Sequence, residues 1–132
     1  MARQQVSVIS LEHAAKYKGQ RIGEGHLKGQ CATGVQLVFS AAGKPLGLTS
    51  TWKEGIRVKG NRIIPGTAIA SFREGRYAND HATIFIRETK IGLEVWDQWD
   101  GKLWGTRMLR FDYNGNTPYS NDGDLFSVIE KR

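Results

Sequence analysis

The residue best suited to nucleophilic chemistry is Cys31, the only cysteine in the chain. Apolar residues recur after it at spacings of three and four, which predicts a helix over residues 31–42 that Gly43 ends. A helix N-terminus carries about half a positive charge and free N–H groups, which stabilise a thiolate and an oxyanion. The position is suited to a nucleophile, but this segment alone favours the usual role of a free cysteine, that of a small buried hydrophobe. The residues described next favour the reactive thiol.

Three histidines are available as a general base. His81 begins the apolar stretch 81–86, which predicts a buried strand after a turn at residues 77–80. The His81 ring is therefore expected at the edge of a sheet. The alternative is a hydrogen-bonded structural histidine. His26, in the glycine-containing segment before Cys31, is a weaker base candidate, and His13 is expected at the surface of a helix.

Asp97 and Gln98 are adjacent candidates for orienting the histidine. Side chains alternate along a strand, so only one of the two can share the face on which His81 presents its ring. We choose Asp97, because a carboxylate accepts the Nδ1–H bond and also stabilises the imidazolium. Gln98, Trp99 and Gln30 are then expected to bind substrate. Cys31, His81 and Asp97 would be the nucleophile, base and orienting group that amide hydrolysis requires.

The elements that position these residues begin with helices and continue with strands. Ser10 is expected to cap a helix over residues 11–18, after a short strand or extended segment at 6–9, and a short helical turn is expected at 52–56. Strands are predicted at 67–72, 81–86, 93–99, 103–111 and 125–129. This order predicts one α+β domain over residues 1–132, with the N-terminal helices packed on an antiparallel sheet of about five strands.

Composition narrows the range of partners. Nineteen Lys and Arg against 13 Asp and Glu give a formal charge of +6, which favours nucleic acid, anionic lipid or an acidic cell-wall polymer. No apolar run is long enough to span a membrane or to serve as a signal peptide, so cytosolic synthesis is expected. Asp122 and Asp124 lack the glutamate of a calcium loop and predict a turn. No metal or other cofactor is expected.

Three segments carry a resemblance to a known group of enzymes. Gly-Gln-Cys at 29–31, Ile-Ile-Pro-Gly-Thr-Ala-Ile-Ala-Ser-Phe at 63–72 and His-Ala-Thr-Ile-Phe-Ile at 81–86 resemble the pattern of NlpC-type and CHAP-type papain-like cysteine amidases. The spacing, the Val-Trp-Asp-Gln-Trp-Asp-Gly segment and residues 120–124 are most similar to the compact type VI secretion amidase effectors. The resemblance covers residues 20–130 and extends to Cys31 and His81; the third catalytic residue varies among these families.

The resemblance implies a papain-like core and a peptidoglycan amidase. Such effectors are made in the cytoplasm, exported by the type VI secretion apparatus without a signal peptide, and act in the periplasm of a target cell, while an immunity protein protects the producer. It also favours the D-Ala to diaminopimelate cross-link over the bond between D-Glu and diaminopimelate. The alternatives are a basic nucleic-acid-binding barrel, with aromatic residues stacking on bases, and a non-catalytic wall-binding module; nucleic acid is not the expected partner.

Overall fold

A computed structural model describes residues 5–111 and 121–131, and over these residues the helices precede most of the strands, as predicted for the α+β class. The helical elements, with η marking a 3-10 turn, are α1 (Leu11–Ala15), η1 (Gly25–Leu27), α2 (Cys31–Ala41), η2 (Thr49–Thr51) and η4 (Gly123–Leu125). The strands are β1 (Gln5–Val6), β2 (Lys53–Arg57), β3 (Ala68–Arg73), β4 (Arg76–Glu88), β5 (Gly92–Trp99), β6 (Lys102–Arg110) and β7 (Phe126–Lys131).

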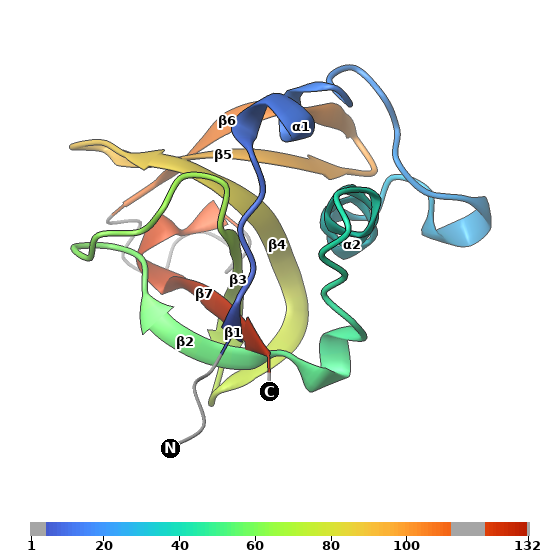
Figure 1. Cartoon of the computed structure of the whole chain (residues 1–132). Coiled ribbons are helices and arrows are strands. Elements are labelled where there is room, and N and C mark those ends of the chain that lie inside the picture. Colours follow the sequence, from blue (N-terminus) through green and yellow to red (C-terminus); the bar gives the residue numbers. More distant parts are fainter. Residues whose placement is uncertain (1–4, 112–120, 132) are drawn as a thin grey trace.

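The strands form one curved sheet in the order β1-β7-β3-β4-β5-β6, with β2 also paired to β7 (Figure 1). All of the pairings in the described part of the chain are antiparallel. The prediction of about five strands is wrong, because residues 5–111 and 121–131 already form a sheet of seven strands. The helical turn expected at 52–56 is largely β2, and only Thr49–Thr51 is helical. The partner strand of β2 is β7, at the other end of the chain. No local sequence pattern therefore indicates this pairing.

The turn between β3 and β4 lies earlier than predicted. Glu74 and Gly75 both have positive φ, 52° and 77°, as a two-residue type I′ hairpin requires. The predicted turn at 77–80 is therefore wrong, and His81 lies inside β4 rather than at its start. The pairing shifts from Phe72 opposite Tyr77 to Ala70 opposite Ala82, so residues 78–81 bulge from the strand. A bulge of this kind redirects the side chains that follow it.

Helix α2 packs across β4 and β5 (Figure 1). Its apolar stripe of Val35, Val38 and Phe39 is fully buried in a core cluster that also contains Trp104. A second cluster, centred on residues such as Phe126, fills the other side of the sheet. Both helix starts follow the sequence prediction, although α1 is shorter than expected. The Ser10 hydroxyl caps α1 by accepting a 3.1 Å hydrogen bond from the backbone N–H of residue 13.

Candidate active site

Cys31 is the first residue of α2, and its side chain is half-buried. The N-cap residue Gln30 has an extended backbone and makes no side-chain capping bond. The N–H groups of the first turn are therefore not occupied by a cap side chain, and they add to the positive end of the helix dipole. This end of the helix favours a negative charge on the thiol.

Gln98 fixes the N-terminal end of α2 to the sheet. Its side chain is fully buried, and its Oε1 accepts from the N–H of Ile22 at 2.9 Å. Its Nε2 donates to the carbonyls of Ile22 and Gln30 at 3.0 and 2.8 Å. Because the amide is occupied by backbone groups on both sides, this placement favours a structural role for Gln98 over the substrate-binding role predicted from the sequence.

The close approach of α2 to β5 depends on Gly34. A Cβ atom at this position would lie 2.8 Å from Gln98 Nε2 and 3.1 Å from Trp104 Cζ3. Both neighbours are fully buried, and the Gln98 amide is held by its backbone hydrogen bonds. The glycine thus lets the helix lie directly on the strand that carries Asp97, which sets the distance between Cys31 and that strand.

His81 is buried, and its Nε2 lies 2.6 Å from Asp97 Oδ2. Asp97 is fully buried on the neighbouring strand β5, so the structure brings together the two residues that the sequence paired. The bonded nitrogen is Nε2, and the prediction of an Nδ1–H bond is wrong. Because Asp97 engages Nε2, the Nδ1 atom is the ring nitrogen that remains for the thiol.

Two cations from β6 also bind Asp97. Arg107 Nε donates to Asp97 Oδ2 at 2.6 Å, and Lys102 Nζ lies 3.2 Å from Oδ1. Arg107 also donates to Asn121 Oδ1 at 3.1 Å, and its NH2 lies 3.2 Å from His81 Nε2. The carboxylate is thereby kept ionised and held in one orientation by groups on two strands.

The pKa values of Cys31, His81 and Asp97 are shifted in directions that favour the charged form of each group. Burial acts to raise the pKa of Cys31, but the hydrogen bond and positive charge of His81 outweigh it, so this pKa lies below its usual value. Burial acts to lower the pKa of His81, but Asp97 and Cys31 raise it overall. The pKa of Asp97 is lowered by His81 and Arg107 despite burial. These shifts favour a thiolate and imidazolium pair beside an ionised carboxylate.

These residues open onto a cleft of about 370 Å³ lined by Cys31, Asp80, His81, Trp99, Arg107 and Asn121. Trp99 is 40% exposed at its rim, with the Arg107 guanidinium carbon 4.6 Å from its ring centroid. An exposed aromatic ring next to the reactive groups is suited to contact a substrate. Trp99 thus lies in the cleft, and its contact with substrate stays a prediction.

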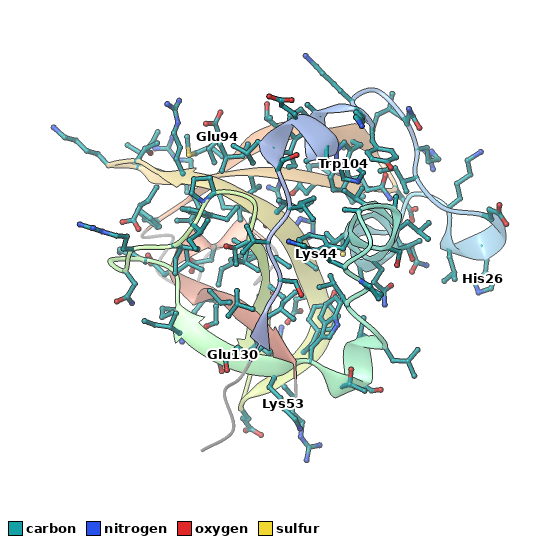
Figure 2. All side chains as sticks on the ribbon, viewed as in Figure 1. His26, Lys44, Lys53, Glu94, Trp104 and Glu130 are labelled. Carbon is teal, nitrogen blue, oxygen red and sulfur yellow. The ribbon has the colours of Figure 1, made fainter. Side chains whose placement is uncertain are left out.

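The remaining predicted residues, Gln30, His26 and His13, do not line this cleft. Gln30 is exposed, and its Nε2 donates to the His26 carbonyl at 3.3 Å. His26 itself is exposed on the outlying turn η1 (Figure 2). His13 Nε2 lies 2.9 Å from the carbonyl of Val38, which indicates a structural role. Neither histidine lines the cleft, so His81 is the histidine that the structure places beside Cys31.

The sequence prediction missed three residues of this region. Tyr77 was placed in a turn, yet its hydroxyl lies 3.9 Å from Cys31 Sγ. Arg107 falls within the predicted strand 103–111 and Asn121 within the segment 120–124, and neither pattern indicates a site residue. Alternation along residues 103–111 could have placed Arg107 on a sheet face, but its contact with Asp97 depends on the register between β5 and β6.

Over residues 5–111 and 121–131, no group of three or more His, Cys, Asp or Glu side chains is arranged to hold a metal ion. Asp122 instead caps η4, accepting from the N–H of Asp124 at 2.9 Å, which is the turn predicted from the sequence. None of the described helices has the length and apolar character needed to span a membrane.

Comparison with known proteins identifies related chains. The family model for domesticated amidase effector 2 matches residues 1–129. A type VI secretion amidase effector 2 protein from Salmonella typhi is 33% identical over 101 residues, covering 64% of this chain and 76% of that protein. Domesticated amidase effector 2 from Ixodes scapularis is 38% identical over 85 residues, covering 62% of this chain and 58% of the tick protein.

A solved structure of type 6 secretion amidase effector 2 superposes with a TM-score of 0.78 at 29% sequence identity, covering 96% of this chain and 95% of that one. The predicted resemblance to the compact type VI secretion amidase effectors is confirmed by these matches. Since the family model extends over nearly the whole chain, the protein belongs to the domesticated amidase effector 2 family.

Proposed function

We propose that this protein is a peptidoglycan amidase that cleaves peptide bonds of the cell wall with Cys31 as its nucleophile. The observation that carries the proposal is the cleft in which the N-terminus of α2 presents Cys31 beside the buried His81 and Asp97 pair. The amidase names of the related proteins support the class of substrate. The papain-like core implied by the sequence is consistent with this arrangement of a helix-borne cysteine against a strand-borne histidine.

The first half of the reaction forms a thioester. The Cys31 thiolate attacks the carbonyl carbon of the peptide bond, and the negative charge moves to the carbonyl oxygen. His81 then gives the proton on Nδ1 to the departing amine as the C–N bond breaks. Asp97 remains ionised and holds the ring through Nε2. The products of this half are the free amine and an acyl group on the sulfur.

The second half returns the enzyme to its starting state. Neutral His81 takes a proton from a water molecule as the water attacks the thioester, and the Cys31 thiolate leaves with the bonding electrons. The N–H groups at the start of α2 are placed to stabilise the oxyanion in both halves. One such donor lowers the activation free energy by about 3 kcal/mol in comparable sites.

Several biological properties follow as parts of the same proposal. The related secretion effectors support export by a type VI apparatus, and peptidoglycan as the substrate implies action in the periplasm of a target cell. A cognate immunity protein would protect the producer. The bond we propose is the D-Ala to diaminopimelate cross-link, and a formal charge of +6 favours association with an anionic wall polymer.

Digestion of purified sacculi tests the function. The wild-type protein is expected to release new muropeptides, and mass spectrometry identifies the bond from the fragments. Cys31→Ala should release none while keeping its circular dichroism spectrum, because one small side chain at a helix start adds little packing. Binding of sacculi without cleavage would instead support a wall-binding module, and retention of single-stranded DNA would support a nucleic-acid-binding protein.

A further inference from the structure

Tyr77 has a contact with Cys31 that the mechanism above does not use. Its hydroxyl oxygen lies 3.9 Å from Cys31 Sγ. Its ring is held by Trp52, with centroids 4.9 Å apart, and by Phe72, at 6.4 Å. Trp52 is itself buried and donates from Nε1 to the Leu46 carbonyl at 3.1 Å. Packing on two aromatic side chains limits where the hydroxyl can move, so its position beside the sulfur is fixed by the core.

The fold brings Tyr77 and His81 to the same sulfur from one strand. In a regular strand, residues four apart would be separated by more than 12 Å, too far to contact one atom. In β4 the pairing shifts between Tyr77 and Ala82, and the bulge lets both ends of the segment reach Cys31. The backbone N–H of Ala82 also acts to lower the pKa of Cys31.

We propose that Tyr77 is a catalytic residue whose hydroxyl donates a hydrogen bond to the Cys31 thiolate and acts as a donor beside His81. Each donor lies on β4, while the sulfur is carried by α2. The sulfur is therefore held between the helix end and one bulged strand. A thiolate held on several sides has few orientations, and this aids attack along one direction.

The protonation of Tyr77 fits a donor. Burial and the nearby Cys31 raise the pKa of its hydroxyl, and Asp80 on the same strand adds to the effect. The charged groups that line the cleft with the sulfur are Asp80 and His81 on β4 and Arg107 on β6, and Asp97 lies behind His81. Tyr77 therefore keeps its proton across the pH range in which the thiolate and imidazolium pair exists, and it donates without changing charge.

The energetic consequence follows from the charge of the acceptor. A hydrogen bond to an ionised group is roughly twice as strong as a bond to a neutral one, so the hydroxyl stabilises the thiolate more than the thiol. Loss of the hydroxyl should raise the pKa of Cys31 and reduce the fraction of reactive sulfur. From the size of such bonds, we expect a shift of about one pH unit.

Tyr77→Phe tests the proposal, since phenylalanine keeps the ring contacts with Trp52 and Phe72. The rate of iodoacetamide labelling is measured against pH by mass spectrometry, and the single cysteine makes every label a report on Cys31. The midpoint should rise by about one pH unit, and kcat on a soluble muropeptide should fall by a larger factor than KM changes. Tyr17→Phe, which alters the tyrosine beside His13 on α1, should leave both unchanged.

A labelling midpoint in Tyr77→Phe equal to that of the wild type overturns the proposal. If Tyr77→Phe fails to fold, 3-fluorotyrosine at position 77 keeps the shape and makes the hydroxyl a stronger donor; the midpoint should then fall, and an unchanged midpoint would also overturn the proposal. The labelling assay needs no substrate, so it stands apart from the proposed function on which the kinetic part rests. Failure of the wild-type protein to cleave sacculi would reject that function and leave the labelling result intact.

Discussion

Arg107 and His81 share one oxygen of Asp97. Arg107 Nε and His81 Nε2 each lie 2.6 Å from Asp97 Oδ2, while Arg107 NH2 lies 3.2 Å from His81 Nε2. When Nε2 is protonated, the guanidinium and the ring are both donors, so their mutual repulsion opposes the attraction that each has for the carboxylate. The strength with which Asp97 stabilises the imidazolium is therefore set by Arg107 as well as by His81.

Asp97→Asn should keep the fold and lower kcat by roughly 100-fold or more, with a smaller effect on KM. The amide cannot stabilise an imidazolium as a carboxylate does, and the ring loses its preferred tautomer. Steady-state kinetics on a soluble muropeptide would measure both constants. The assignment fails if Gln98→Ala lowers kcat more than Asp97→Asn in a folded protein.

Gln98→Ala should act mainly on stability. The substitution leaves the N–H of Ile22 without its acceptor, while the carbonyls of Ile22 and Gln30 keep their bonds from the N–H groups of Gly29 and Gly34. Removal of a buried partner costs about 1 to 3 kcal/mol for each group left unsatisfied. Urea unfolding should show a clear loss of unfolding free energy, whereas an unchanged midpoint would remove Gln98 from the support of α2.

Arg107→Met should change the pH profile of the reaction. Removal of the positive charge leaves His81 as the group bonded to Asp97 Oδ2, with Lys102 still beside Oδ1. The pKa of His81 should therefore rise, and the alkaline fall in kcat/KM should move to higher pH by roughly half to one unit. Arg110→Met, at an exposed arginine on the same strand, is the matched control. A shift of the same size in both variants would mean that overall charge, rather than the contact with Asp97, sets the profile.

The lowered pKa of Asp97 also predicts how stability depends on pH. A carboxyl whose folded pKa lies below its unfolded value of about 3.9 stabilises the protein above that value, and the contribution is lost as the pH falls through the folded pKa. The unfolding free energy of the wild type should therefore exceed that of Asp97→Asn at pH 6, and the gap should narrow below about pH 4. A constant gap across this range would show that Asp97 is not ionised in the folded protein.

Gly34→Ala should separate α2 from β5. The added methyl group would lie 2.8 Å from Gln98 Nε2, and overpacking of this kind costs about 1 to 3 kcal/mol. Because Cys31 is on the same helix, activity should fall by as much as about 100-fold. Ser40→Ala, at an exposed site of α2, should change neither stability nor rate. A fully active, stable Gly34→Ala variant would show that the close contact is unnecessary.

The candidate residues of the site could be predicted from the sequence more fully than the strand pairings and the bulge that bring them together. Cys31, with its helix, and the alternation of Asp97 and Gln98 could be predicted because each depends on local periodicity. The contact of Tyr77 with Cys31 could not, since it depends on the bulge in β4, and the Asn79-Asp80 pair resembles a turn. β2 was missed for a related reason, because its conformation depends on pairing with β7.

The most direct test of the account is the pH dependence of Cys31 alkylation in the wild type and in His81→Ala. We expect the wild type to react with iodoacetamide at a midpoint below the ordinary thiol value of about 8.5, and His81→Ala to move that midpoint upward because the thiolate loses its imidazolium partner. His26→Ala and His13→Ala should match the wild type. A wild-type midpoint near that of an ordinary thiol, or an equal shift in His26→Ala, would contradict the pairing of Cys31 with His81.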